Sequence, residues 1–198
     1  MAITIYADLA TLKDSLKITD TDDDDQLTKN LNGASRAIDT VTGRRFSLDD
    51  NVSARKLRTD KRTVELDNGE QLLLVPDIAT DAGLIVETGS KSTWTPVTDY
   101  ELYPEDALVG GWPITGLTLD TRCWPSMPGQ RVRITAKWGW SAVPDDIEQA
   151  CLILSRRLFA RKDSPGGVMG SQDWVVSLAR RDPDVQSLIE HFQLPGFG

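Results

Sequence analysis

The chain has 198 residues, a formal net charge of −8 and a hydrophobic fraction of 39%. This length and apolar content suffice for a packed core and exclude a disordered chain, while the negative charge argues against a free-standing nucleic-acid binder, which has to neutralise phosphates. Acidic residues exceed basic ones in each third of the chain, so the charge is spread over a solvated surface and is not gathered in a tail.

The sequence shows neither a clear targeting segment nor a cysteine pattern typical of disulfides or metal sites. The first residues lack the charged and long apolar regions of a signal peptide, and no apolar run approaches the roughly 18–20 residues of a membrane helix. We therefore expect a protein that is made and folds in a cytoplasm, with no membrane partner. Cys123 and Cys151 are too few for a disulfide framework or a metal site, and a small buried thiol is the expectation for Cys151.

Two amphipathic helices are predicted near the N-terminus, over residues 6–17 and 23–42. In the second helix, apolar side chains follow the 4-3-4-3 spacing of one helix face: Leu27, Leu31, Ala34, Ile38 and Val41. Asp22, Asp23, Asp24 and Asp25 lie at its start, where carboxylates meet the positive end of the helix dipole. Gly43 is suited to cap its end.

The middle of the chain, residues 53–140, is rich in β-branched and aromatic residues between turn signals. Asp67-Asn68-Gly69 predicts a hairpin turn, because Asn and Gly tolerate positive φ. Residues 131–138 alternate polar and apolar side chains, as a half-buried strand does. Further strands are expected at 62–66, 71–75, 84–88, 94–97, 100–103 and 117–119.

Helical patterns return after residue 141. Pro144 favours the first turn of a helix over 144–162, and Arg156 and Arg157 suit its C-terminal end. The segment Asp173–Leu178 is interpreted as a strand, and Asp182 and Pro183 begin a last short helix over about 183–192. The pattern predicts an α+β fold: a small helical bundle formed by 1–52 and 141–198, with a β-rich insertion over 53–140.

Catalytic equipment is scarce, so we expect no enzyme and no cofactor. The single histidine, His191, lacks the surroundings of a nucleophile pair. A calcium loop beginning at Asp20 would need Gly at its sixth position and Glu at its twelfth, where this chain has Asp25 and Leu31. The six tryptophans favour assembly with other chains, since aromatic residues are enriched at protein interfaces.

Two stretches carry a family resemblance. The first runs Ala7-Asp8-Leu9, Leu12-Lys13, Leu16, Ile18-Thr19, Asp23–Gln26, Ala34-Ser35-Arg36-Ala37-Ile38-Asp39 and Thr42-Gly43-Arg44-Arg45-Phe46. The second runs Val143-Pro144-Asp145-Asp146-Ile147, Ala150-Cys151, Leu154, Arg157-Leu158-Phe159, Arg161–Pro165 and Asp182–Val185. In order and spacing they resemble the head-to-tail connector (adaptor, or head-completion) proteins of long-tailed bacteriophages, in the version with a β insertion between the second and third helices.

The resemblance implies a structural virion protein without catalysis. Such proteins form a ring, usually of twelve subunits, that binds below the portal protein. The ring extends the DNA channel and gives the next stopper or tail-completion protein its platform. DNA would pass through without sequence-specific binding, and the location implied is the head-tail interface of the virion, after assembly in the host cytoplasm.

Two sets of site residues follow as expectations. Asp22, Asp23, Asp24 and Asp25 are expected to line the DNA channel, because an acidic wall repels phosphates. The C-terminal segment is expected to dock on the portal through apolar side chains, namely Trp174, Val185, Leu188, Ile189, Phe192 and Phe197. The alternative for its last helix is packing on the protein's own helical core, since so short a helix is marginal alone in water. The alternatives are another stopper or tail-completion protein, or a β-rich carbohydrate-binding or adhesion module whose tryptophans stack on sugars.

Overall fold

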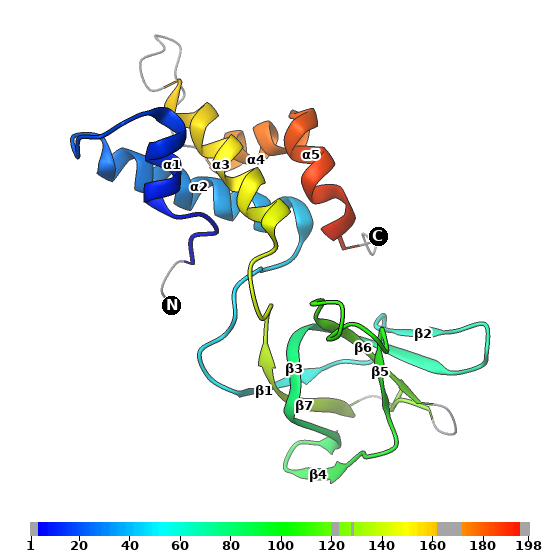
Figure 1. Cartoon of the computed structure of the whole chain (residues 1–198). Coiled ribbons are helices and arrows are strands. Elements are labelled where there is room, and N and C mark those ends of the chain that lie inside the picture. Colours follow the sequence, from blue (N-terminus) through cyan, green and yellow to red (C-terminus); the bar gives the residue numbers. More distant parts are fainter. Residues whose placement is uncertain (1–3, 120–122, 128, 162–171, 195–198) are drawn as a thin grey trace. The chain divides into compact units, whose positions relative to one another are not determined.

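The computed structural model describes residues 4–119, 123–127, 129–161 and 172–194. The chain divides into two compact units. A helical unit comprises Met1–Phe46 and Val143–Gly198, and a β unit comprises Ser47–Ala142 (Figure 1). The predicted α+β class is confirmed, and the structure places the β-rich residues between the second and third helices.

The first two helices of the helical unit are close to their predicted positions. Helix α1 spans Leu9–Leu16; the Asp8 side chain caps it by accepting from the Thr11 N–H at 2.8 Å, and Lys17 ends it in the left-handed region. Helix α2 spans Asp24–Thr42 and ends at Gly43, whose φ is +70°. A left-handed C-cap at this position favours glycine, as the sequence predicts.

The C-terminal half of the helical unit differs from prediction in one element. Helix α3 spans Asp145–Phe159, α4 Gln172–Arg181, α5 Pro183–Ile189, and a 3₁₀ turn η1 follows over Glu190–Phe192. The strand predicted for Asp173–Leu178 is therefore wrong. Val175 and Ala179, four residues apart, are both buried, so tertiary packing of one helix face overrides the local β preference of Val175 and Val176.

Helix α2 is the centre of the helical unit, in contact with α1, α3 and α4, while α5 packs on α3 and α4 (Figure 1). Six large apolar side chains of α1, α2 and α3 are fully buried in this core: Leu12, Leu27, Leu31, Ile38, Ile147 and Leu154. Leu9 and Leu158 are only half-buried. Burial of each such side chain stabilises the fold by about 1.5–3 kcal/mol relative to exposure.

A polar network fastens the N-terminal segment to α2. The Tyr6 hydroxyl donates to Asp39 and accepts from the Phe46 N–H at 3.0 Å. Arg36 forms an ion pair with Asp39 at 2.9 Å. Burial raises the pKa of the Tyr6 phenol, and the hydrogen bond to Asp39 adds to the rise. Burial also raises the pKa of the Asp39 carboxyl, against the lowering effect of the Tyr6 hydrogen bond and of Arg36.

The β unit is a single antiparallel sheet of seven strands in the order β1-β7-β3-β6-β5, with β2 and β4 also paired to β3. The strands are β1 Ser53–Leu57, β2 Thr63–Glu65, β3 Gln71–Ser90, β4 Thr93–Pro96, β5 Glu101–Tyr103, β6 Ile114–Leu119 and β7 Arg131–Trp138. The predicted hairpin at Asp67-Asn68-Gly69 is confirmed, since it joins β2 to β3 with Gly69 at φ +88°.

The long strand β3 organises this sheet. Its first part pairs with β2 and β6, and its second part pairs with β4 and β7, with register shifts between Leu74 and Ile85 (Figure 1). The core of the unit includes three tryptophans, Trp124, Trp138 and the nearby Trp140, each at most 3% exposed. Their indole N–H groups all find acceptors, on Gln71, Ser53 and Asp77 respectively.

Candidate functional site

Cys151 and His191, the residues with nucleophile or base chemistry considered in the sequence, have different surroundings in the helical unit. Cys151 is fully buried and burial raises its thiol pKa; its sulfur lies 3.4 Å from the Ser35 hydroxyl inside the helical core. His191 stacks on Phe192 and lies 3.6 Å from Asp146, on the surface of the helical unit. Within the described ranges, no three His, Cys, Asp or Glu side chains gather as metal ligands.

The acidic run is at the N-terminal end of α2, as the sequence predicts. Asp24 forms an ion pair with Lys13 of α1 at 2.5 Å, and an Asp20 carboxylate oxygen accepts from the Asp22 N–H at 3.2 Å. Asp22 and Asp25 are exposed, whereas Asp23 and Asp24 are half-buried. Asp24 of this run thus links α2 to α1, whereas Asp22 and Asp25 are exposed to solvent.

The C-terminal segment belongs largely to the helical core. Val185 and Ile189 are fully buried, and Phe192 is 3% exposed with its ring edge-to-face on Phe46 at 5.4 Å. The expectation that these three side chains are free to anchor the portal is wrong for this conformation, because α5 and η1 use them to pack on their own unit. A short helix needs such a surface, since it is marginal alone in water.

The remaining members of the predicted docking set differ from these three. Leu188 and Trp174 are half-buried, and the Arg161 guanidinium lies over the Trp174 ring at 5.1 Å. Phe197 lies outside the described residues. A docking role for the C-terminal segment can therefore rest only on its outer side.

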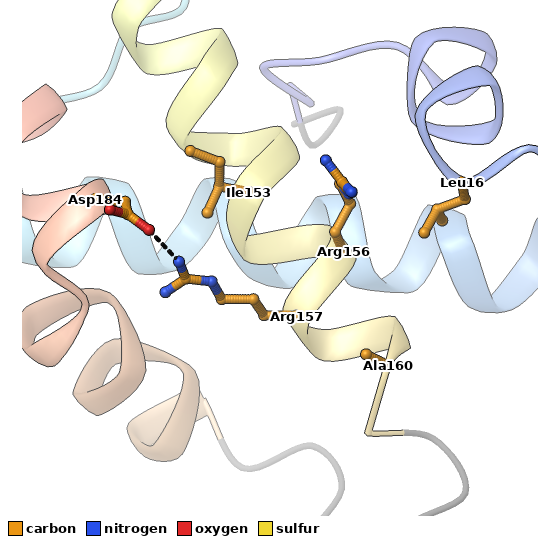
Figure 2. A pocket seen from close by; sticks show the side chains of 6 residues that line it. All are labelled: Leu16, Ile153, Arg156, Arg157, Ala160 and Asp184. Carbon is orange, nitrogen blue, oxygen red and sulfur yellow. Dashed lines mark hydrogen bonds and ion pairs between the residues drawn. The ribbon is translucent and has the colours of Figure 1, made fainter.

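A pocket of about 460 Å³ lies on the helical unit between α1, α3 and α5 (Figure 2). Its apolar part is formed by Leu16, Ile153 and Ala160, and its charged part by Arg156, Arg157 and Asp184. Arg157 is fixed by ion pairs to Asp182 and to Asp184, the latter at 2.5 Å. The exposed Arg156 guanidinium has no carboxylate partner in the part of the chain that the structure describes. We call this site the arginine pocket.

From the sequence, Arg156 and Arg157 were interpreted only as cations that suit the C-terminal end of their helix. The structure adds Leu16 from α1 and Asp184 from α5, which lie far from α3 in sequence. Leu16, Ile153 and Ala160 lie beside the ion-paired Arg157 and beside Arg156, which has no carboxylate partner among the described residues. Such a pocket can accept an apolar side chain that has a carboxylate next to it.

The β unit presents a second surface that sequence reasoning missed. On the outer face of the sheet, Arg133 of β7 pairs with Glu87 of β3 through two hydrogen bonds of 2.5 and 2.6 Å. The Arg133 guanidinium also lies 4.5 Å from the centre of the Trp94 ring, and the Lys56 ammonium lies 5.6 Å from it. The alternation of side chains along β7 predicts that Arg133 lies on the outer face of the sheet. The pairing of β7 with β1 and β3, and of β3 with β4, then brings Lys56, Glu87 and Trp94 close to it.

Three of the six tryptophans are buried in the β unit and cannot stack on a sugar. Trp124, Trp138 and Trp140 are core residues, Trp94 is covered by cations, and Trp112 packs against Trp140 at 5.4 Å. Stacking on a sugar requires an exposed ring face, which the three core residues lack. These positions count against the carbohydrate-binding alternative.

Comparisons with known proteins agree with the resemblance seen in the sequence. Residues 6–71 match the family model described as "Phage gp6-like head-tail connector protein". No curated protein matches the chain. The resemblance to head-tail connectors is confirmed over that segment, which contains α1, α2, β1 and β2.

Two solved structures share the fold of the whole chain. One is described as "Neck of empty GTA particle computed with C6 symmetry", with a TM-score of 0.56, 20% identity, and coverage of 100% of this chain and 95% of that chain. The other is described as "Neck of native GTA particle computed with C12 symmetry", with a TM-score of 0.50, 19% identity, and coverage of 100% and 98%. At these identities the likeness establishes the fold alone.

Proposed function

We propose that this chain, whose residues 6–71 match the model of phage gp6-like head-tail connector proteins, is a structural adaptor of a virion. It forms a ring, of twelve subunits as a rule, that binds below the portal protein, extends the DNA channel and carries the next stopper or tail-completion protein. The observation that carries the proposal is the connector match combined with a neck-protein fold over the full chain.

The physical properties of the chain are compatible with this role. A net charge of −8 lets many copies surround DNA without strong adhesion, because phosphates are repelled. None of the helices within the described ranges has the length and apolarity that crossing a bilayer requires. A heterologous contact between two different surfaces of neighbouring copies closes into a ring when its rotation permits, and such rings need no catalytic group.

Within this proposal, the acidic run contributes to the channel wall. Asp22 and Asp25 are its exposed members, so they are the ones that would face DNA. The portal contact then involves the outer side of the C-terminal segment, with Trp174 and Leu188, since Val185, Ile189 and Phe192 are buried. The virion neck is the proposed location, with assembly in the host cytoplasm.

The test is assembly with the cognate portal. The purified chain is mixed with portal rings, and complexes are separated by size and imaged by electron microscopy. The proposal expects a second, coaxial ring of this chain below the portal. A chain that stays monomeric beside the portal, or that binds only after a different connector protein has bound, would instead favour the stopper or tail-completion alternative.

A further inference from the structure

The loop between β5 and β6, residues 104–112, has an unusual surface. Val109 at its tip is 90% exposed, the highest value among the large apolar side chains described as exposed. Glu105 and Asp106 are exposed beside it, and neither carboxylate has a partner in the described part of the chain. We call residues 104–112 the acidic-apolar loop. A single exposed valine is ordinary, but an ordered tip that holds a valine next to two unpaired carboxylates is more specific.

The acidic-apolar loop is closed by its own hydrogen bonds and anchored on the core of the β unit. Four backbone hydrogen bonds of 2.8–3.3 Å close it, among them Gly110 N–H to Asp106 O and Trp112 N–H to Ala107 O. Ala107 is buried, Leu108 packs against the sheet core, and the Trp112 ring lies against Trp140. Because these residues anchor the loop from both sides, Val109 is held outward in a fixed position, and docking would cost little ordering entropy.

The arginine pocket of the helical unit has the complementary character (Figure 2). Its floor of Leu16, Ile153 and Ala160 is apolar, and its volume of about 460 Å³ is ample for a valine side chain. The Arg156 guanidinium stands at its edge without a carboxylate partner among the described residues, while Arg157 is already held by Asp182 and Asp184. The pocket can therefore take up an added apolar side chain together with a carboxylate for Arg156, and the acidic-apolar loop offers both.

We propose that the acidic-apolar loop of one copy docks in the arginine pocket of the next copy, with Val109 on the apolar floor and Glu105 or Asp106 paired with Arg156. The inference rests on the proposed ring function, and it names the contact between subunits. The two surfaces are different, so the contact is heterologous and can repeat around a closed ring. Charge pairing gives the contact its direction, because reversing either partner sets like charges against each other.

The first test reverses the charges during ring assembly on the portal. Arg156→Glu alone, and Glu105→Arg with Asp106→Arg, should each raise the chain concentration needed for rings by at least about tenfold. All three changes together should restore most of the wild-type assembly. Lys29→Glu on α2 and Glu65→Arg on β2 are the matched controls, since both residues are exposed and lie outside the loop, the arginine pocket and the C-terminal segment. Wild-type assembly of Arg156→Glu, or no recovery in the combined variant, would overturn the proposed contact.

The second test detects the contact itself. In a Cys123→Ser background, Val109→Cys combined with Ala160→Cys should give a ladder of covalent multimers after mild oxidation of assembled rings. Val109→Cys with Thr40→Cys, an exposed position away from the pocket, is the control. Rings without the ladder would overturn the contact and leave the adaptor function standing. A wild-type chain that forms no ring with its portal would overturn both.

Discussion

Replacing Phe192 by alanine tests whether the C-terminal segment is part of the helical core. The ring is 3% exposed and packs edge-to-face on Phe46, and the Phe192 carbonyl accepts from the Arg44 guanidinium at 2.7 Å. Truncation of a buried phenylalanine costs about 3–5 kcal/mol, through lost burial and the cavity that remains. Against a total stability of about 5–15 kcal/mol for a typical domain, this loss would remove at least about a fifth of the free energy of unfolding of the helical unit.

The two units can be followed separately in one denaturant titration. Five of the six tryptophans, all except Trp174, lie in the β unit, so fluorescence reports mainly on the sheet. The helical circular dichroism signal reports on the other unit. Phe192→Ala should shift the circular dichroism transition to lower denaturant and leave the fluorescence transition in place. The exposed neighbour provides the control, since Gln193→Ala should change stability by no more than about 0.5 kcal/mol.

Truncation tests the same assignment. A chain that ends at Ser171 lacks α4, α5 and η1, and thereby the contacts of α4 with α2 and of α5 with α3. The helical unit of that truncated chain should lose its cooperative transition. Two results would refute the assignment of the C-terminal segment to the core: a loss of unfolding free energy below about 1 kcal/mol for Phe192→Ala, or an intact helical transition after truncation. Either result would indicate that the segment is a free docking arm.

Three further predictions follow. Leu31→Asp places an unpaired charge where the native side chain is 1% exposed, so it should cost several kcal/mol in chemical denaturation, whereas Asp at the exposed Thr40 of the same helix should cost little. Burial raises the pKa of Tyr6 above its ordinary value near 10, so the unfolded chain loses this proton at a lower pH than the folded chain does. The contribution of Tyr6 to stability should therefore be fully present below about pH 10 and should fall as the pH rises further. Urea midpoints measured across this range should fall less steeply with pH in the Tyr6→Phe variant. If Asp22 and Asp25 line the channel, a reconstruction of the ring should place both at the lumen, and a lumen lined mainly by Lys and Arg would contradict this.

The helices were predictable from sequence where apolar spacing and caps agree. Gly43, with its left-handed φ, and the stripe of α2 are examples, because periodicity and cap chemistry are local properties. The hairpin turn at Asn68-Gly69 was predictable for the same reason. Helix α4 was not, since Trp174, Val175 and Val176 favour a strand locally and only packing on α2 decides for a helix.

The site residues were harder to predict than the elements. Strand β1 has little apolar alternation and is ordered by pairing with β7, so it was missed, and the position of Lys56 beside Trp94 was missed with it. The arginine pocket joins α1, α3 and α5, and no local pattern gives that meeting. The burial of Val185 and Ile189 likewise depends on which surface α5 meets, which a short amphipathic helix does not reveal by its own sequence.

Formation of a connector ring on a portal can be observed by electron microscopy of the purified chain mixed with its cognate portal, with the symmetry of each ring determined independently. We expect a coaxial ring of this chain beneath the portal, with an open channel along its axis. Portal rings that remain bare at saturating concentrations of the folded chain would contradict this expectation.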